Sequence, residues 1–138
     1  MFGLPFFIAR TFDIMPQYLS LQTFSDQRGN LTVIERILPF DIKRIFYIYG
    51  VDASVRGNHR HHRTIQAAVC LVGSCRIVCK SGPGQAEETY HLSSPADCII
   101  LQPEDWHYMD SFSPDAILMV LASEYFDAND YIFEPYAS

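Results

Sequence analysis

Short apolar runs limit the possible folds of this chain more than any other feature of its sequence. The runs are rich in β-branched and aromatic residues, and each one is closed by Gly, Pro, Asp or Ser. They cover residues 31–37, 42–51, 65–73, 74–82, 86–92, 97–103 and 116–123. This pattern of short apolar runs separated by turn residues is typical of an antiparallel β-sandwich or barrel and not of alternating strands and helices. We therefore predict an all-β fold, with a turn or short helix only in the tail at 124–133.

Two glycine-containing segments are expected to reverse the chain between strands. Gly73 and Ser74 separate two apolar runs, and glycine supplies the positive φ that a two-residue hairpin loop needs. The segment KSGPGQ at 80–85 predicts a second, looser turn. Both segments are interpreted as connections between consecutive strands.

Length and charge narrow the class of protein. A chain of 138 residues, 49% of them hydrophobic, predicts one domain spanning 1–138. The net charge of -6 argues against nucleic acid or an anionic membrane as a partner. The 4 cysteines form no CxxC pair, which favours a reduced, cytoplasmic protein. Residues 1–20 lack the basic start of a signal peptide and are interpreted as an N-terminal arm that could pack on a partner subunit.

The segment RGNHRHH at 56–62 concentrates histidine and arginine just before an apolar run. His59 and His61 are two residues apart, so on an extended strand both side chains point to the same face. The sequence therefore predicts two imidazoles on one wall of a sheet.

The residues after this pair extend the pattern. Gln66 and Gly73 follow His61 at a spacing that resembles the first motif of the cupins, and Pro103 and His107 resemble the second. The resemblance implies a double-stranded β-helix, that is, a jelly-roll barrel of antiparallel strands whose inward residues line a pocket.

A metal site is disfavoured at this position. Gln66 occupies the slot of the acidic ligand, and a neutral amide coordinates divalent metals weakly. Three neutral histidines, His59, His61 and His107, can still bind zinc, so this alternative stays open. We expect no metal and no cofactor.

A closer resemblance covers most of the chain. It is carried by DQRGNL (26–31), PFDIKRIFYI (39–48), RGNHRHH (56–62), VCLVGSCRI (69–77), WHYM (106–109) and VLASEYFDANDYI (120–132). Together these segments resemble the cupin-type sugar nucleotide 3,4-ketoisomerases. The resemblance implies a dTDP-4-keto-6-deoxy-hexose substrate, isomerisation to the 3-keto sugar without metal, a role in deoxysugar biosynthesis, and a homodimer.

The resemblance also implies roles for individual residues. His59 would be the base that removes the C3 proton, and His61 would shuttle the second proton or polarise the carbonyl, since histidine titrates near neutrality. Arg28 and Arg44 would hold the diphosphate or orient the sugar through their planar donors. Further expected substrate contacts are Tyr47, Arg56, Gln66, Trp106 and His107.

Two departures from the family pattern keep other functions open. Phe46 stands where the family's KRxYY run has its first tyrosine, and Tyr47 and Tyr49 face away from it on a strand. Tyr108 follows His107 where the family usually has an acid. The missing phenol favours a non-catalytic nucleotide-sugar-binding cupin as the alternative to the isomerase, and a metal-dependent cupin is the third possibility.

Overall fold

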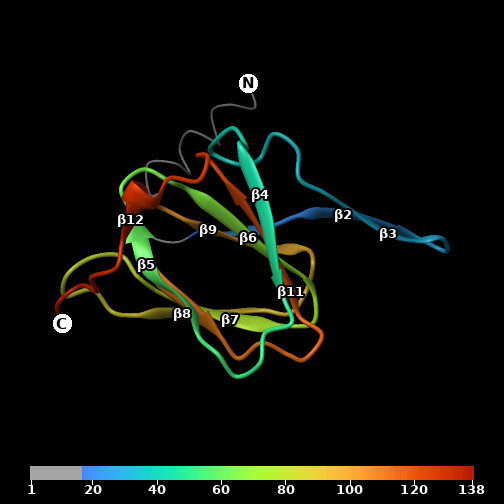
Figure 1. The fold of residues 1–138 in the computed structure, drawn as a ribbon. Helices are drawn as coiled ribbons and strands as arrows, with labels where there is room; N and C mark the ends of the chain where they lie inside the picture. Colours follow the sequence, from blue (N-terminus) through green and yellow to red (C-terminus); the bar gives the residue numbers. More distant parts are fainter. Residues whose placement is uncertain (1–16) are drawn as a thin grey trace.

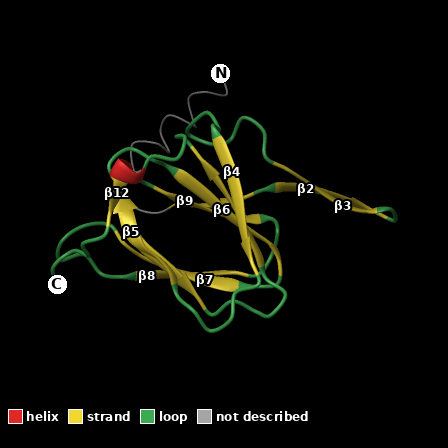
Figure 2. Cartoon of the chain, viewed as in Figure 1, coloured by secondary structure: helices red, strands yellow, loops and turns green. Residues whose placement is uncertain are grey.

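The structure is a computed structural model that describes residues 17–138 (Figure 1). Two five-stranded antiparallel sheets face each other, and a separate two-stranded hairpin projects from them (Figure 2). The predicted N-terminal arm at 1–20 lies largely outside the described residues. Its last residues form a strand of the first sheet and not a free arm.

The first sheet has the strand order β1-β9-β6-β11-β4. Its strands are β1 (Gln17–Ser20), β9 (Asp97–Leu101), β6 (Gln66–Val72), β11 (Ile117–Ala122) and β4 (Arg44–Tyr49). The central strand β6 is buried on both faces at its start, which is why its sequence, QAAVCLV, is a continuous apolar run and not an alternating one.

The second sheet has the order β12-β5-β10-β7-β8. Its strands are β12 (Tyr131–Ile132), β5 (Arg56–His61), β10 (Trp106–Asp110), β7 (Cys75–Lys80) and β8 (Glu88–Leu92). A single 3-10 turn, η1 (Ala128–Asp130), precedes β12, in agreement with the turn or short helix expected in the tail.

Apolar side chains form two layers. One lies between the sheets and includes Ile77, Leu92 and Leu118, each almost fully buried. The other lies on the outer face of the first sheet, where the loop that carries Leu38 and Phe40 packs over the strands. The four cysteines are buried free thiols within these layers.

The predicted all-β jelly roll is confirmed, although the two sheets do not close into one barrel. The expected hairpin at Gly73 and Ser74 is wrong. Gly73 does take a positive φ of 71°, but β6 belongs to the first sheet and β7 to the second, so the turn carries the chain across the molecule. The same turn chemistry suits both connections, so sequence alone did not separate them. The looser turn at 80–85 does join paired strands, β7 and β8.

The projecting hairpin pairs β2 (Gln22–Asp26) with β3 (Gly29–Val33) and extends away from the sheets (Figure 1). Phe24 and Leu31 on it are exposed. Among residues 17–138, no helix has the length and apolar character needed to cross a membrane.

Candidate active site

A cavity of about 400 Å³ opens between the two sheets. Its floor is apolar and is formed by side chains such as Ile48, Ile77 and Leu118, which come from both sheets. Its polar side-chain groups come from seven residues: Arg44, Tyr47, Arg56, His59, Gln66, His107 and Tyr131. A volume of this size fits a small organic ligand.

A β-bulge on β5 aims His59 into this cavity. Gly57 and Asn58 take positive φ values of 94° and 61°, which glycine and asparagine tolerate best. The register between β5 and β10 shifts at this point, and His59 then lies directly opposite His107. A Cβ on Gly57 would lie 3.1 Å from the carbonyl oxygen of His107, so any other residue would also be crowded here.

His59 is the imidazole that faces the cavity. Its ring centroid lies 4.9 Å from that of His61 and 4.9 Å from that of His107. Burial lowers the pKa of His59, and a backbone hydrogen bond to Gly57 only partly opposes this effect. The ring is therefore neutral at neutral pH and able to accept a proton.

His107 is held rigidly behind His59. Its side chain is 2% exposed, and its Nδ1 lies 2.9 Å from the backbone carbonyl oxygen of Asp105. Because a carbonyl oxygen only accepts, this contact assigns the ring proton to Nδ1 and leaves Nε2 as an acceptor. Burial, with a smaller effect from the neighbouring His59, lowers the pKa of His107 to about 3.

His61 does not line the cavity. It is 4% exposed and lies directly across from Tyr131 on β12, with ring centroids 4.8 Å apart. Burial and the nearby His59 lower the pKa of His61 to about 4, and the carboxylate of Asp130 acts in the opposite sense. His61 therefore packs behind His59 as a neutral ring.

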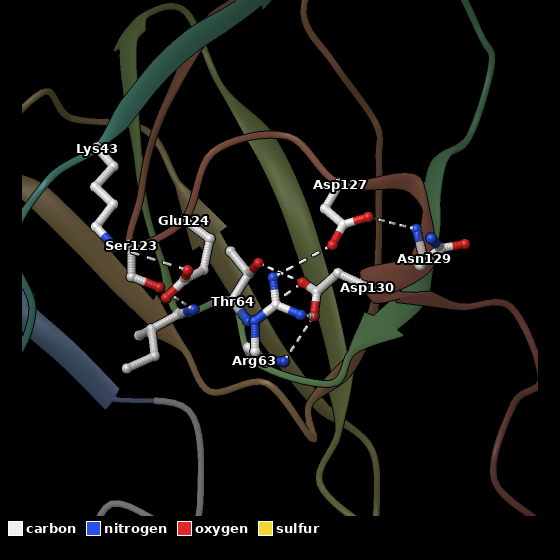
Figure 3. Close-up of polar contacts among 9 residues, drawn as sticks. Lys43, Arg63, Thr64, Ser123, Glu124, Asp127, Asn129 and Asp130 are labelled. Carbon is white, nitrogen blue, oxygen red and sulfur yellow. Dashed lines mark hydrogen bonds and ion pairs between the residues drawn. The ribbon is translucent and has the colours of Figure 1, made fainter.

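Asp130 ties the end of the chain to the turn that follows β5 (Figure 3). Its carboxylate accepts hydrogen bonds from the backbone N–H of Arg63, the backbone N–H of Thr64 and the Thr64 hydroxyl. Arg63 also pairs with it at 3.8 Å. Burial raises the pKa of Asp130, but these hydrogen bonds outweigh burial and bring it below the ordinary value. The network fixes β12, and with it Tyr131, against the histidines.

Arg44 lies at the mouth of the cavity between two aromatic rings. Its guanidinium carbon is 4.6 Å from the centroid of Phe46 and 5.2 Å from that of Phe126. The neighbouring Lys43 is the residue that pairs with a carboxylate, at 3.9 Å from Glu124 (Figure 3). The stacked guanidinium of Arg44 keeps its donors available for an anion.

The structure does not bring all the predicted residues to the cavity. Arg28 lies on the projecting hairpin, where it pairs with Asp26 at 2.6 Å and its side chain is 87% exposed. Trp106 is not among the lining residues, because successive side chains of β10 alternate and His107 takes the inner face. Tyr47 borders the cavity, but it is 63% exposed and its ring stacks on that of Tyr49.

Arg56, Gln66 and His107 do line the cavity, and their expected contacts with a substrate stay a prediction. Sequence reasoning did not single out Tyr131, although it is central to the site. The available signal was its place in the segment 120–132, which carried the family resemblance.

Fold and cavity together define a cupin-like jelly roll in which imidazoles, a phenol and guanidinium groups surround one ligand-sized space. A family model described as "FdtA: WxcM-like, C-terminal" matches residues 15–137. The chain belongs to this family.

Relatives with names are similar over most of the chain. A TDP-4-oxo-6-deoxy-alpha-D-glucose-3,4-oxoisomerase of Aneurinibacillus thermoaerophilus is 42% identical over 117 residues, which cover 83% of each chain. The solved 3,4-ketoisomerase from Helicobacter canadensis is 34% identical with a TM-score of 0.81, covering 86% of this chain and 90% of that one.

A third relative is known with a ligand. It is a histidine-to-asparagine mutant of the 3,4-ketoisomerase QdtA from Thermoanaerobacterium thermosaccharolyticum, in complex with TDP-4-keto-6-deoxyglucose. It is 36% identical with a TM-score of 0.82, and the match covers 86% of this chain and 87% of that one. The predicted resemblance to the sugar nucleotide 3,4-ketoisomerases is thereby confirmed.

Proposed function

We infer that this protein is a sugar nucleotide 3,4-ketoisomerase that acts on a TDP-4-keto-6-deoxyhexose in deoxysugar biosynthesis. The observation that carries this conclusion is the neutral imidazole of His59, which faces a cavity with cationic groups at its mouth, in a chain of this family. The relatives named above are isomerases of this kind.

The reaction moves two protons. We propose that His59 takes the proton from C3 of the sugar, next to the C4 ketone, and that an enediol forms. The imidazolium then returns a proton to C4, while the hydroxyl proton on O3 moves to O4. A neutral imidazole suits the first step, because only its unprotonated nitrogen can accept.

His61 supports this base from behind. It contacts the ring of His59 but does not reach the cavity surface, so its proposed part in moving the second proton runs through its ring neighbours. Gln66 and His107 line the cavity and are proposed to hydrogen-bond the sugar; Tyr47 borders it and is proposed to contact the substrate through the part that faces inward.

The mouth is proposed to bind the diphosphate. Arg44 and Arg56 both line the cavity, and guanidinium groups bind phosphate oxygens through parallel donors. Trp106 lies outside the lining residues, so we propose only an indirect role for it in supporting the strand that carries His107.

We propose that the protein works as a homodimer of single cupin domains spanning 1–138. The hairpin of β2 and β3 supports this, because it extends away from its own sheets with Phe24 and Leu31 exposed. Arg28 on this hairpin does not line its own cavity, so its proposed contact with the diphosphate requires a neighbouring subunit. The reduced, buried thiols fit the cytoplasm as the proposed location.

A solvent-exchange experiment tests the reaction. The purified protein is incubated with TDP-4-keto-6-deoxyglucose in deuterated water, and loss of the C3 proton and formation of the 3-keto sugar are followed by NMR. Isomerisation with deuterium incorporation is expected. Absence of both, together with tight binding of TDP, would instead identify a nucleotide-sugar-binding protein.

A further inference from the structure

We propose that Tyr131 is a catalytic residue whose hydroxyl carries the proton from O3 to O4 of the sugar. The inference rests on the proposed ketoisomerase function and assigns a group to its second proton transfer. It comes from three observations: the position of Tyr131, the hydroxyl it offers, and the unsuitability of the other groups that line the cavity.

Tyr131 is the phenol nearest to the proposed base. Its ring centroid lies 4.8 Å from that of His59 and 4.8 Å from that of His61, and the residue lines the cavity. Phe133 stacks on its ring at 6.0 Å, and the preceding residue, Asp130, is anchored by a hydrogen bond from the backbone N–H of Arg63. The ring is therefore held in place beside His59.

The hydroxyl of Tyr131 is available to a ligand. Tyr18, Tyr90 and Tyr136 donate their hydroxyls to oxygens of the protein. No hydrogen bond within residues 17–138 uses the hydroxyl of Tyr131. A phenol both donates and accepts, so it can give a proton to one oxygen and take a proton from the adjacent oxygen.

The other polar groups of the cavity are less suited to this relay. Arg44 and Arg56 have no acceptor, and a guanidinium stays charged at neutral pH. Gln66 carries an amide, which does not exchange its protons on the way through a reaction. His107 presents an acceptor nitrogen, because its ring proton is committed to the carbonyl oxygen of Asp105.

The remaining imidazole of the cavity, that of His59, already has a role in the first proton transfer. His59 holds the proton taken from C3 while the enediolate exists, so it cannot serve the oxygens at the same time. Phe46 lines the same cavity and has no hydroxyl. Tyr47 is the other phenol that borders the cavity, but it is 63% exposed and its ring stacks on that of Tyr49, not on that of His59. Tyr131 is thus the bifunctional group left beside His59 among the described residues.

The step balances with no further reactant. As His59 removes the C3 proton, the electron pair of that bond forms the C3–C4 double bond and the carbonyl pair moves to O4. Tyr131 donates its hydroxyl proton to O4 and takes the proton of the O3 hydroxyl. The C3 carbonyl forms as His59 protonates C4, and Tyr131 ends the cycle protonated, as it began.

The test compares two reactions of one intermediate. Without the relay, the enediolate can still be reprotonated at C3, which puts deuterium into unreacted substrate, but it cannot become the 3-keto sugar easily. In Tyr131→Phe we expect product formation to fall about 100-fold while deuterium at C3 of the substrate still accumulates. The control is Tyr49→Phe, which removes a phenol from the exposed outer face.

The outcomes separate this proposal from the proposed function. If the parent protein forms no 3-keto sugar, the isomerase function itself fails. If the parent is active and Tyr131→Phe keeps its rate of product formation, the relay is wrong. The relay is also wrong if product formation and exchange fall by the same factor, because that result means Tyr131 only supports His59.

Discussion

The two ends of the cavity differ in their chemistry. At the inner end, His59, His61 and His107 pack ring against ring, and burial lowers the pKa of each one. At the mouth, Arg44 is stacked between aromatic rings, and Arg56 is exposed. In the proposed reaction, proton transfer would therefore take place in a desolvated region, and permanent charge would stand where a diphosphate can remain partly in water.

The largest effect is expected from removing the base. In His59→Asn we expect kcat to fall about 1,000-fold with little change in KM, since an amide cannot accept the C3 proton. The measurement is steady-state isomerisation of TDP-4-keto-6-deoxyglucose. His62→Asn, on the exposed side of the same segment, is the matched control. A His59→Asn variant as fast as its parent would refute the assignment.

A smaller effect of the opposite kind is expected at the mouth. In Arg44→Leu we expect KM to rise about 10- to 100-fold, which corresponds to the loss of a charge-assisted hydrogen bond, while kcat changes less. Lys43→Leu removes the same charge from the neighbouring residue and should leave KM near the parent value. Equal losses of kcat in the Arg44 and His59 variants would erase the distinction between the two ends.

A fall in pH should affect turnover and binding differently within a single protein. As the pH falls below the lowered pKa of His59, the base becomes protonated and kcat should drop by about tenfold per pH unit. Binding of TDP-glucose, which lacks the ketone, should hold constant from pH 8 to pH 5, because guanidinium groups keep their charge. Parallel loss of binding and turnover would contradict this expectation.

Low pH should also lower the stability of the folded protein, because of the buried histidines at the inner end of the cavity. His61 and His107 have pKa values of about 4 and about 3, below the ordinary 6.5, so protons bind the unfolded chain more tightly. Their stabilising effect is complete above about pH 6.5 and is lost as the pH falls toward 4. The midpoint of thermal unfolding, measured by circular dichroism, should fall by several degrees over this range.

A buried carboxyl provides the control for that experiment. Burial raises the pKa of Asp105 to about 6, so its charge costs stability above pH 6 and this cost is relieved in acid. The Asp105→Asn variant lacks this relief and should lose stability more steeply than the parent between pH 6 and pH 4. An equal or shallower decline would show that Asp105 does not titrate in this way.

The smallest effect is expected from chelation. Each proposed proton transfer uses groups of the protein and substrate alone, so dialysis against a chelator should leave kcat and KM unchanged. Metal content is measured before and after dialysis. Loss of activity that a divalent cation restores would favour the metal-dependent cupin instead.

Much of the fold could be predicted from the pattern of apolar runs. The alternation around His59 and His61 correctly placed both imidazoles toward the interior, because side chains on a strand alternate between faces. The pattern did not show that a bulge at Gly57 turns His59 alone to the cavity surface, since backbone φ values depend on the neighbouring strand.

Contacts between distant segments could not be read from the sequence. Tyr131 belongs to a strand of two residues, which is too short to produce a periodic pattern, and its position depends on the pairing of β12 with β5. The position of Arg28 away from the cavity likewise depends on where the hairpin points. In both cases tertiary structure decides the role of the residue.

The carboxylate of Asp130 also has a consequence for the order in which the site assembles. Asp130 and Tyr131 follow β11 in the chain, whereas His59 and His61 lie on the much earlier strand β5. A ribosome-bound chain that has emerged only as far as β11 therefore lacks one wall of the cavity. Tyr131 reaches the histidines only when the segment after β11 docks onto strands made before it.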